Sequence, residues 1–597
     1  MDRREWLRAS AALTVSARAS AAPPPDHAKR EPRTLRVCFR AAETGFDPPQ
    51  VGDINSAMVL SSIFESPLTY DYVARPVALK PQTAAAMPEV SSDFKRFVFH
   101  IRPGIFFADD PAFKGVPREL VAQDHVYAIK RHYDPRNNSE HLYVFENAKV
   151  LGLSALRERA LKTKTRFDYD TEVEGLRTLG RYSFELRLAE PQPRMLFNFA
   201  SPMLTGAMAR EVVDAYGDDI AAHPVGTGPF CLGTWRRQSY IELVRNPRFR
   251  EQVFDGTPTP GDTQAEAIAR ELRGKRLPQV DRVQISVIIE SQPRWLSFLN
   301  GQQDVLELPN EFARLAIPNG RLAPHLERRR VRAQTAPRAD MLMTFFNMQD
   351  PTVGGYSPQK VALRRAVALA LNDDERRELI EHGQAVPAQS VVAPFTSGYD
   401  EHYRSTMSEH NRLKAMALLD TYGYVDRDGD GFREMPDGSP LVLRLSTAPD
   451  QRSRAITELW RKQMAAVGLR IRFEIANWPD LLKMSRAGAM MMWSFTWIAE
   501  SPDGSFFLGI AYSRNINESN DARFSWPAFD RLFEQQKVMS DGPERDAVMR
   551  EAKNMLVAYM PYKAHSHGIV TDLLQSWVSG HWRHPFMRDL WRYVAVD

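Results

Sequence analysis

The chain has 597 residues, of which 43% are hydrophobic and 25% charged, and its net charge is +4. A chain of this size and composition is expected to form two to four globular lobes, and its near balance of charge excludes the concentrated basic surface that nucleic-acid binding needs. No stretch reaches the ~18 consecutive apolar residues of a membrane helix. The two cysteines, Cys38 and Cys231, lack the C-x-x-C spacing of a metal or redox site, and a disulfide between them stays open.

Residues 1–22 have the composition of an export leader. Arg3 and Arg4 precede Trp6, a weakly apolar run follows over 9–17, and small residues occupy 19–22. This pattern resembles a twin-arginine signal peptide and predicts a periplasmic protein, the alternative being an unstructured tail rich in Arg and Ala. Residues 23–33 are then expected to be a spacer.

The folded part is expected to start with a strand, because Leu35, Val37 and Phe39 alternate with polar residues. A helical turn is predicted over 59–64. Further along, residues 97–101 predict a strand and 121–131 a helix. We expect the β-rich block of about 71–180 to be a small inserted lobe.

A glycine-proline motif lies at residues 224–230. Gly226 and Gly228 predict a tight, backbone-exposed turn, because glycine adopts positive φ freely and the following proline fixes its own φ. The strand-like runs 230–235 and 240–245 predict a hairpin after it. Taken alone, the motif is more simply explained as an ordinary loop.

The second half of the chain contains a clear βαβ pattern. Residues 441–445 alternate as a strand, and 469–475 alternate as another. Between them, Ile456, Trp460 and Met464 share one face of a helix. Such a unit joins parallel strands through a right-handed crossover. A second helix is predicted over 544–559, ended by a proline.

Together these strings resemble a known family. The motif at 224–230, followed by Trp235 and by Arg245-Asn-Pro, is similar to the signature of the extracytoplasmic solute-binding proteins of family 5, which feed peptide importers of the ABC class. Other strings resemble its subgroup for oligopeptides and microcin C: Phe167-Asp168-Tyr169-Asp170, Gly423-Tyr424-Val425-Asp426, Asp541-Gly542-Pro543-Glu544-Arg545 and Trp577-Val578-Ser579-Gly580.

The resemblance implies an α/β fold of the type II periplasmic binding protein class (cluster C), with two α/β lobes joined by a hinge and a third, inserted lobe. On this basis lobe I is expected to comprise 34–70, 181–285 and 561–597. The inserted lobe is expected over 71–180 and lobe II over 286–560.

A ligand site is expected at the end of the strand near residue 497. In peptide-binding relatives an aspartate soon after the tryptophan of this strand neutralises the α-amine of the peptide, and Glu500 occupies that position here. The expected ligand-binding residues are Glu500, Asp503, Trp493, Phe495, Trp497, Glu65, Tyr70 and Asn347. Each has a structural alternative: a loop carboxylate for Glu500, a turn for Asp503 and core packing for the aromatic residues.

The segment 426–437 follows the calcium-loop pattern in part. Asp426, Asp428 and Asp430 stand at positions 1, 3 and 5, Gly431 stands at 6, and Asp437 replaces the usual glutamate at 12. A structural calcium ion and a plain turn rich in Asp and Gly therefore both stay open.

We expect a binding protein with no catalytic residues and no cofactor other than that calcium ion. No G-x-S-x-G, H-E-x-x-H or phosphate-binding loop is present, and His565-x-His567 is interpreted as a pair of histidines in a strand. The expected protein is a monomer that captures oligopeptides or peptide-like solutes and delivers them to an inner-membrane ABC permease. The alternatives are a secreted hydrolase and a calcium-dependent adhesion or scaffold protein.

Overall fold

The computed structural model describes residues 32–406 and 408–597, and the predicted export signal lies outside the described residues. Residues 33–597 form one compact unit. Within the described ranges, no helix has the length and apolar character needed to span a membrane. Cys38 and Cys231 are both free thiols, so no disulfide joins them.

The first sheet has four strands and combines residues from two distant parts of the chain. Its strands in order are β1 (Thr34–Phe39), β12 (Arg282–Val287), β9 (Tyr240–Arg245) and β8 (Phe230–Arg236). β1 is parallel to β12, whereas β9 is antiparallel to both β12 and β8. The predicted first strand and the predicted hairpin are therefore confirmed. The segments that connect these strands include the helices α1 (Ile54–Ile63), α5 (Pro202–Thr205), α6 (Arg210–Tyr216) and α7 (Thr263–Leu272).

The glycines of the motif at 224–230 are buried, which corrects the prediction of an exposed turn with positive φ. Both are required by close packing against the end of α1. A Cβ atom on Gly226 would lie 2.1 Å from the carbonyl oxygen of Ile63, and one on Gly228 would lie 2.6 Å from it. The Gly228 N–H donates to that same oxygen over 2.8 Å.

The inserted region contains an antiparallel sheet covered by helices. Its strands in order are β4 (Glu89–Val90), β5 (Arg96–His100), β7 (Ser183–Arg187) and β6 (Leu176–Gly180), and its helices are α2 (Ala122–Tyr133), α3 (Leu142–Ala148) and α4 (Leu153–Thr163). Phe99 and Phe184 stack at 4.8 Å between ring centroids inside this core. Because β7 pairs with β5, the sheet continues to Arg187, beyond the expected limit of residue 180.

The largest sheet has eight strands and carries the predicted βαβ unit. Its main order is β13 (Val305–Glu307), β20 (Tyr562–Leu574), β15 (Asp340–Phe346), β19 (Met492–Ile498), β17 (Val442–Thr447) and β18 (Arg470–Ile475), with β14 (Arg332–Pro337) and β16 (Ala385–Pro387) also pairing with β20. The parallel pairing of β17 with β18 around α14 (Gln451–Ala465) confirms the βαβ prediction. The predicted helix at 544–559 is confirmed as α18 (Pro543–Tyr559).

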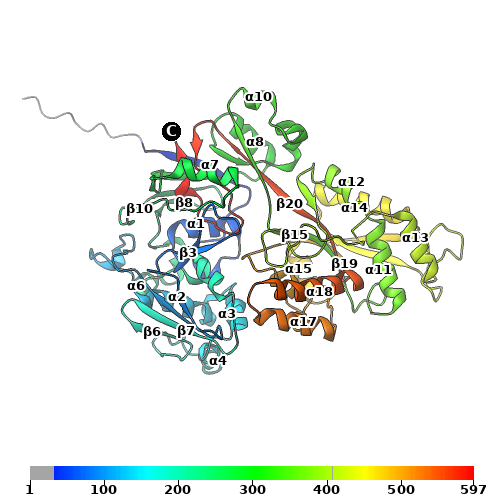
Figure 1. Cartoon of the computed structure of the whole chain (residues 1–597), viewed down its shortest axis with the longest axis horizontal. Helices are drawn as coiled ribbons and strands as arrows, with labels where there is room; N and C mark the ends of the chain where they lie inside the picture. Colours follow the sequence, from blue (N-terminus) through cyan, green and yellow to red (C-terminus); the bar gives the residue numbers. More distant parts are fainter. Residues whose placement is uncertain (1–31, 407) are drawn as a thin grey trace, which may run out of the picture. The chain divides into compact units, whose positions relative to one another are not determined.

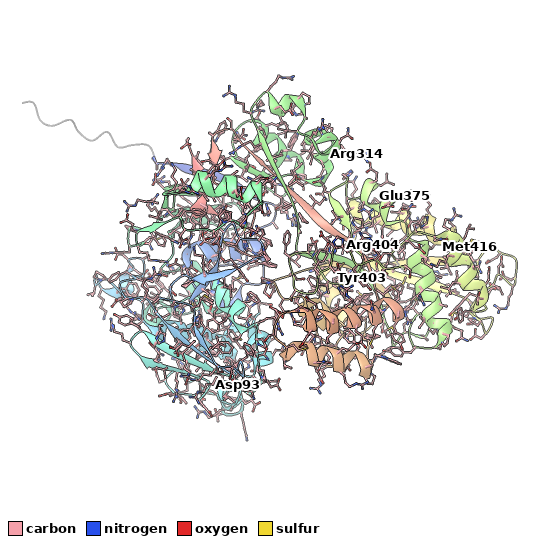
Figure 2. All side chains as sticks on the ribbon, in the orientation of Figure 1. Asp93, Arg314, Glu375, Tyr403, Arg404 and Met416 are labelled. Atoms are coloured by element: carbon pink, nitrogen blue, oxygen red, sulfur yellow. The ribbon has the colours of Figure 1, made fainter. Side chains whose placement is uncertain are left out.

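The other helices of this half follow the chain from α8 to α17. They are α8 (Ser291–Leu299), α9 (Ala313–Ala316), α10 (Pro324–Glu327), α11 (Pro358–Ala370), α12 (Asp373–Leu379), α13 (Arg412–Thr421), α15 (Trp478–Arg486), α16 (Ser505–Gly509) and α17 (Pro527–Val538). Glu375 of α12, labelled in Figure 2, accepts hydrogen bonds from Lys462 and Gln463 of α14 and so ties these two helices together. Three short strand pairs complete the structure: β2 (Leu68–Tyr70) with β3 (Leu79–Pro81), β10 (Gln252–Val253) with β11 (Arg276–Leu277), and β21 (Val578–Ser579) with β22 (Ala595–Val596).

Strand β20 links several hydrophobic cores. It is the long red arrow of Figure 1, and it pairs with β15 near its start and with β14 and β13 near its end. Tyr562 packs in the same core as α18, whereas Leu573 packs beside α8 and Leu574 packs beneath β1. Two antiparallel segments, 332–346 and 562–574, therefore run through both halves of the fold. The exact lobe boundaries stay a prediction.

Candidate ligand-binding site

A cavity of about 2040 Å³ lies where these segments meet. Its wall includes residues of β1, β14 and β20, the end of β19 and residues of the C-terminal stretch from 581 to 594. Pockets for drug-sized ligands measure roughly 300–1,000 Å³, so this cavity has room for a ligand of several residues.

Glu500 lies just after β19 and is exposed. Its Oε2 accepts a hydrogen bond of 3.3 Å from the hydroxyl of Tyr143 in α3. Ile498, two residues before it, and Pro502, two residues after it, both line the cavity. This position leaves the carboxylate accessible at the end of a strand, where a charged ligand group can reach it.

Asp503 has a different environment, because two arginines already neutralise its carboxylate. Arg194 Nε lies 3.0 Å from one oxygen and Arg545 Nη2 lies 2.6 Å from the other. Although burial raises the pKa of Asp503, these two cations lower it to about 2. The contacts therefore favour a structural role for this carboxylate over contact with a ligand.

The aromatic side chains of β19 pack into the protein core. Trp493 and Phe495 are 4% and 9% exposed, and their rings stack with centroids 4.8 Å apart. The half-buried Trp497 packs edge-on against Phe506. Successive side chains of a strand point to opposite faces. The residues of β19 that line the cavity are accordingly Thr496 and Ile498, on the other face, which the sequence analysis missed.

Glu65 and Asn347 are buried and hold the backbone and neighbouring side chains in place. Glu65 is fully buried and accepts hydrogen bonds from Gln82, Thr227 and Arg250. Asn347 donates to the carbonyl oxygens of Gly488 and Met490 over 3.0 and 2.8 Å, and its Oδ1 accepts from the Gln349 N–H.

Tyr70 lies beside the cavity-lining segment 581–588. Its ring centroid is 5.2 Å from that of His584, and its hydroxyl interacts electrostatically with Arg588. Burial raises the pKa of Tyr70 above its usual value, so the hydroxyl is neutral and can donate a hydrogen bond. Tyr70 is itself 4% exposed and does not line the cavity, so it supports the wall through its contact with His584.

The sequence analysis missed the C-terminal stretch His581-Trp582-Arg583-His584 and Arg588, all of which line the cavity. The concentration of histidine, arginine and tryptophan between Gly580 and Pro585 was the signal available in the sequence. Nothing in the sequence indicates that this stretch meets Tyr70, which precedes it by more than five hundred residues.

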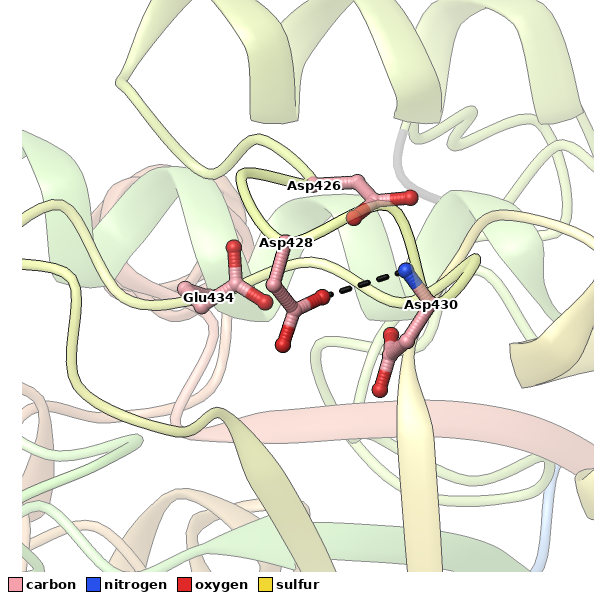
Figure 3. A group of neighbouring side chains, drawn as sticks. All are labelled: Asp426, Asp428, Asp430 and Glu434. Atoms are coloured by element: carbon pink, nitrogen blue, oxygen red, sulfur yellow. Dashed lines mark hydrogen bonds between the residues drawn. The ribbon is translucent and has the colours of Figure 1, made fainter.

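Four carboxylates of the loop after α13 come together, as Figure 3 shows: Asp426, Asp428, Asp430 and Glu434. Their oxygen atoms lie within 4.8 Å of one another, and such oxygens are suitable ligands for calcium. Asp437, expected at position 12, lies outside this group and accepts hydrogen bonds from Ser439 instead. Glu434, and not the expected Asp437, is therefore the fourth carboxylate of the group. Calcium binding stays a prediction.

A Thr–His–Asp chain occurs in the large sheet. His565 Nε2 lies 2.7 Å from Thr344 Oγ1, and its Nδ1 lies 2.6 Å from Asp373 Oδ1. Thr344 and His565 are at most 1% exposed, and none of the three residues lines the cavity. A nucleophile must reach its substrate, so this buried chain is a structural network rather than a hydrolase site.

Comparison with known proteins decides the family. The sequence model of the bacterial extracellular solute-binding proteins, family 5, matches residues 78–519. The chain belongs to this family. The expected family, and with it the type II α/β fold, is confirmed.

Individual relatives cover nearly the whole chain. A di/tripeptide-binding protein of Pseudomonas aeruginosa is 24% identical over 588 residues, which span 95% of this chain and 96% of that protein. Heme-binding protein A of Haemophilus influenzae is 23% identical and spans 94% of this chain and 92% of its own length. Among solved structures, the periplasmic binding protein DppA of Helicobacter pylori, in complex with the peptide STSA, is similar with a TM-score of 0.70 and 19% identity, and covers 94% of this chain and 98% of its own.

Proposed function

We propose that this family 5 protein captures oligopeptides or peptide-like solutes in the periplasm and delivers them to an ABC permease of the inner membrane. The observation that carries the proposal is the large cavity bounded by both halves of the fold, with Glu500 at the end of β19 beside it. The names of the relatives, among them a di/tripeptide-binding protein, support a peptide as the ligand.

In this proposal Glu500 receives the α-ammonium group of the peptide. The carboxylate is exposed, and within the described part of the chain its hydrogen bond from a side chain comes from the neutral hydroxyl of Tyr143, so its charge is available to a ligand cation. A charge-assisted hydrogen bond of this kind contributes roughly 1.5–3 kcal/mol. Backbone edges and the roomy cavity would accept the remaining residues with little regard for side-chain identity.

Ligand capture would occur by closure of the two lobes about the segments 332–346 and 562–574. These antiparallel segments run through both halves, so changes of φ and ψ within them would alter how the halves lie relative to each other. A ligand favours the closed state only through its higher affinity for that state, so contacts on both walls of the cavity are needed. The closed form would then dock on the permease.

The test is to measure binding of trialanine and of N-acetyl-trialanine by calorimetry, with wild type and with Glu500→Gln. We expect the variant to weaken binding of free trialanine by about tenfold or more and to change binding of the acetylated peptide little. Glu311→Gln is the matched control, since Glu311 is an exposed carboxylate that lines the cavity from another element. Equal weakening of both peptides by Glu500→Gln would remove the assignment of the amine to Glu500.

Native mass spectrometry of the purified protein separates this proposal from the alternatives. Co-purified peptides that stay intact on incubation support a peptide receptor and contradict a hydrolase. A co-purified porphyrin would instead favour a heme ligand, as the name of the relative from Haemophilus influenzae suggests for that protein.

A further inference from the structure

Asp340 is a buried carboxylate on the wall of the cavity. It lies at the start of β15 and is 5% exposed. Among the residues that the structure describes, no arginine, lysine or histidine side chain lies within ion-pair distance of this carboxylate. Its Oδ1 accepts the backbone N–H of Gly568 over 2.7 Å. The negative charge of Asp340 therefore has a hydrogen-bond donor but no cation beside it.

The other two buried carboxylates of this wall are already neutralised. Glu381 pairs with Arg452 at 2.8 Å, and Asp572 pairs with Arg583 at 2.5 Å. A buried carboxylate that lacks a cationic partner is costly. Asp340 thus differs from its neighbours in having a charge that a ligand could still compensate.

The electrostatic environment of Asp340 agrees with this difference. Burial raises the pKa of Asp340 above its usual value, and the negative charge of Glu381 adds to the effect. The Gly568 N–H and the charge of Arg338 oppose this shift only in part, since Arg338 is itself bound to Glu307. A cation brought close to Asp340 would stabilise its charged form.

Gly568 in β20 leaves the space that this carboxylate occupies. A Cβ atom on Gly568 would lie 2.9 Å from Asp340 Oδ2 and 3.3 Å from the Cδ atom of Arg338. Gly568 also lines the cavity. While Oδ1 is held by the glycine N–H, Oδ2 receives no hydrogen bond from the described residues and is not among the fully buried atoms. This second oxygen can therefore accept a hydrogen bond from a ligand.

Asp340 lies close to the end of β19 that leads to Glu500. Asp340 and Ile498 are directly opposite each other in the paired strands, and both line the cavity. The Ala499 N–H donates to the carbonyl oxygen of Ala339 over 2.8 Å, so the pairing continues toward Glu500. Opposite and diagonal neighbours on paired strands are roughly 5–8 Å apart. A peptide whose α-ammonium group is at Glu500 therefore brings the side chain of one of its first residues within reach of Asp340.

We propose that Asp340 binds the cationic group of a basic side chain of the ligand, so that the protein prefers peptides with a lysine or arginine close to a free N-terminus. This inference rests on the proposed function and narrows its substrate class. A charge-assisted hydrogen bond is stronger at a carboxylate that is shielded from water than at an exposed one. A neutral side chain at the same place would leave the charge of Asp340 without a partner.

Six tripeptides test the inference by calorimetry. Three contain one lysine and two alanines, with the lysine in position one, two or three, and the other three contain norleucine in the same positions. Norleucine keeps the apolar stem of lysine and lacks its charge. We expect wild type to bind at least one lysine peptide about tenfold or more tighter than the matching norleucine peptide.

Asp340→Asn should bring the two affinities close together, because asparagine keeps an acceptor for the Gly568 N–H but carries no charge. Asp546→Asn is the matched control, since Asp546 is an exposed carboxylate that lines the cavity from α18. It should keep the preference of wild type. Equal binding of lysine and norleucine peptides by wild type at every position, or an unchanged preference in Asp340→Asn, would overturn the inference while leaving peptide capture in place.

A cross-link in wild type decides the inference if Asp340→Asn does not fold. Carbodiimide activates a carboxylate, and the amine of a bound lysine peptide then displaces the activating group to form an amide. Peptide mapping should find this amide at Asp340. Cross-links at other carboxylates only would contradict the inference.

Failure of wild type to bind any of the six peptides would instead count against the proposed function. A thermal shift with excess butylammonium chloride, against potassium chloride at the same concentration, then tests Asp340 separately. A rise in melting temperature for wild type and none for Asp340→Asn supports a cation site at Asp340, whereas equal responses contradict it.

Discussion

Arg194 Nε lies 3.0 Å from Asp503 Oδ2 and joins the segment after β7 to the segment after β19. The same guanidinium donates over 2.8 Å to the carbonyl oxygen of Met539. Arg194 lies next to Met195, which packs in the core of the inserted region, whereas Asp503 belongs to the half that contains α18. This contact therefore connects two separate cores and is expected to exist only when they lie close together.

We expect Arg194→Gln to loosen this connection at a moderate cost in stability. The Arg194 side chain is only 9% exposed, but Asp503 keeps its ion pair with Arg545, so the free energy of unfolding should fall by about 1–3 kcal/mol. Small-angle scattering without ligand should show a larger radius of gyration than wild type.

Arg545→Gln is the contrasting variant, because this fully buried cation also bonds Asp541 and Gln536. Its loss should lower the free energy of unfolding by about 3–5 kcal/mol. An unchanged radius of gyration for Arg194→Gln would show that the Arg194–Asp503 pair does not hold the two cores together.

The two faces of β19 should respond differently to truncation. Phe495→Ala removes a buried ring and should lower the free energy of unfolding by about 3–5 kcal/mol. Ile498→Ala removes a side chain that is 46% exposed and lines the cavity, so it should leave stability nearly unchanged and alter the affinity for trialanine. Denaturant unfolding and calorimetry on both variants check this. If Phe495→Ala instead keeps the stability of wild type and changes the affinity for trialanine, the aromatic face of β19 would be the ligand-binding face.

The sequence predicted the elements whose signals are local. The unit β17–α14–β18 follows from two alternating strands and one helix face, because each periodicity is complete within a few residues. The aromatic residues of β19 show the limit. Alternation indicated that Trp493, Phe495 and Trp497 share a face, but only packing against residues distant in sequence, such as Phe345, decides that this face is the core.

The charges of the site could not be predicted for a related reason. Whether an arginine is paired depends on residues that can lie far away in sequence, as Glu307 does from Arg583. Glu307, for example, is shared by Arg583, Arg338 and Arg40, and no local pattern in the sequence marks such sharing. Glu500 was predictable only through its resemblance to a family position.

The glycine motif gives a prediction that tests its corrected explanation. In Gly226→Ala the new Cβ would lie 2.1 Å from the Ile63 carbonyl oxygen, and backbone atoms cannot move away cheaply. We expect the free energy of unfolding to fall by about 3 kcal/mol or more, or the variant to fail to fold. Gly104→Ala is a useful comparison: its φ of +79° makes the alanine strained, but nothing lies within 4 Å of the new Cβ. The loss there should be about 1 kcal/mol. A loss at Gly226 no larger than the loss at Gly104 would contradict close packing as the reason for the glycine.

We expect the free energy of unfolding to fall as the pH falls from about 6.5 to 4, because some buried histidines stay neutral only in the folded protein. Burial lowers the pKa of His125 to about 4, while its Nδ1 lies 2.9 Å from the carbonyl oxygen of Thr205. Between these pH values the unfolded chain binds a proton that the folded protein does not, so the free energy of unfolding decreases as pH decreases. His125 alone should account for up to about 3 kcal/mol of this decrease in the free energy of unfolding. In His125→Asn, which keeps an N–H donor for Thr205, the slope of stability against pH should be smaller. An identical slope in this variant would assign the dependence to other groups.

The acidic loop after α13 leads to a prediction about calcium. If Asp426, Asp428, Asp430 and Glu434 hold a calcium ion, binding to the folded state alone stabilises it by about 2.7 kcal/mol at a hundredfold excess over Kd. Calcium should then raise the melting temperature of wild type by about a few degrees relative to a chelator. Asp428→Asn should abolish the rise, whereas Asp437→Asn should keep it, because Asp437 lies outside the group and bonds Ser439. Identical melting in calcium and in chelator would contradict a metal site. The loop would then be held by its own contacts, such as the ion pair between Asp430 and Arg470.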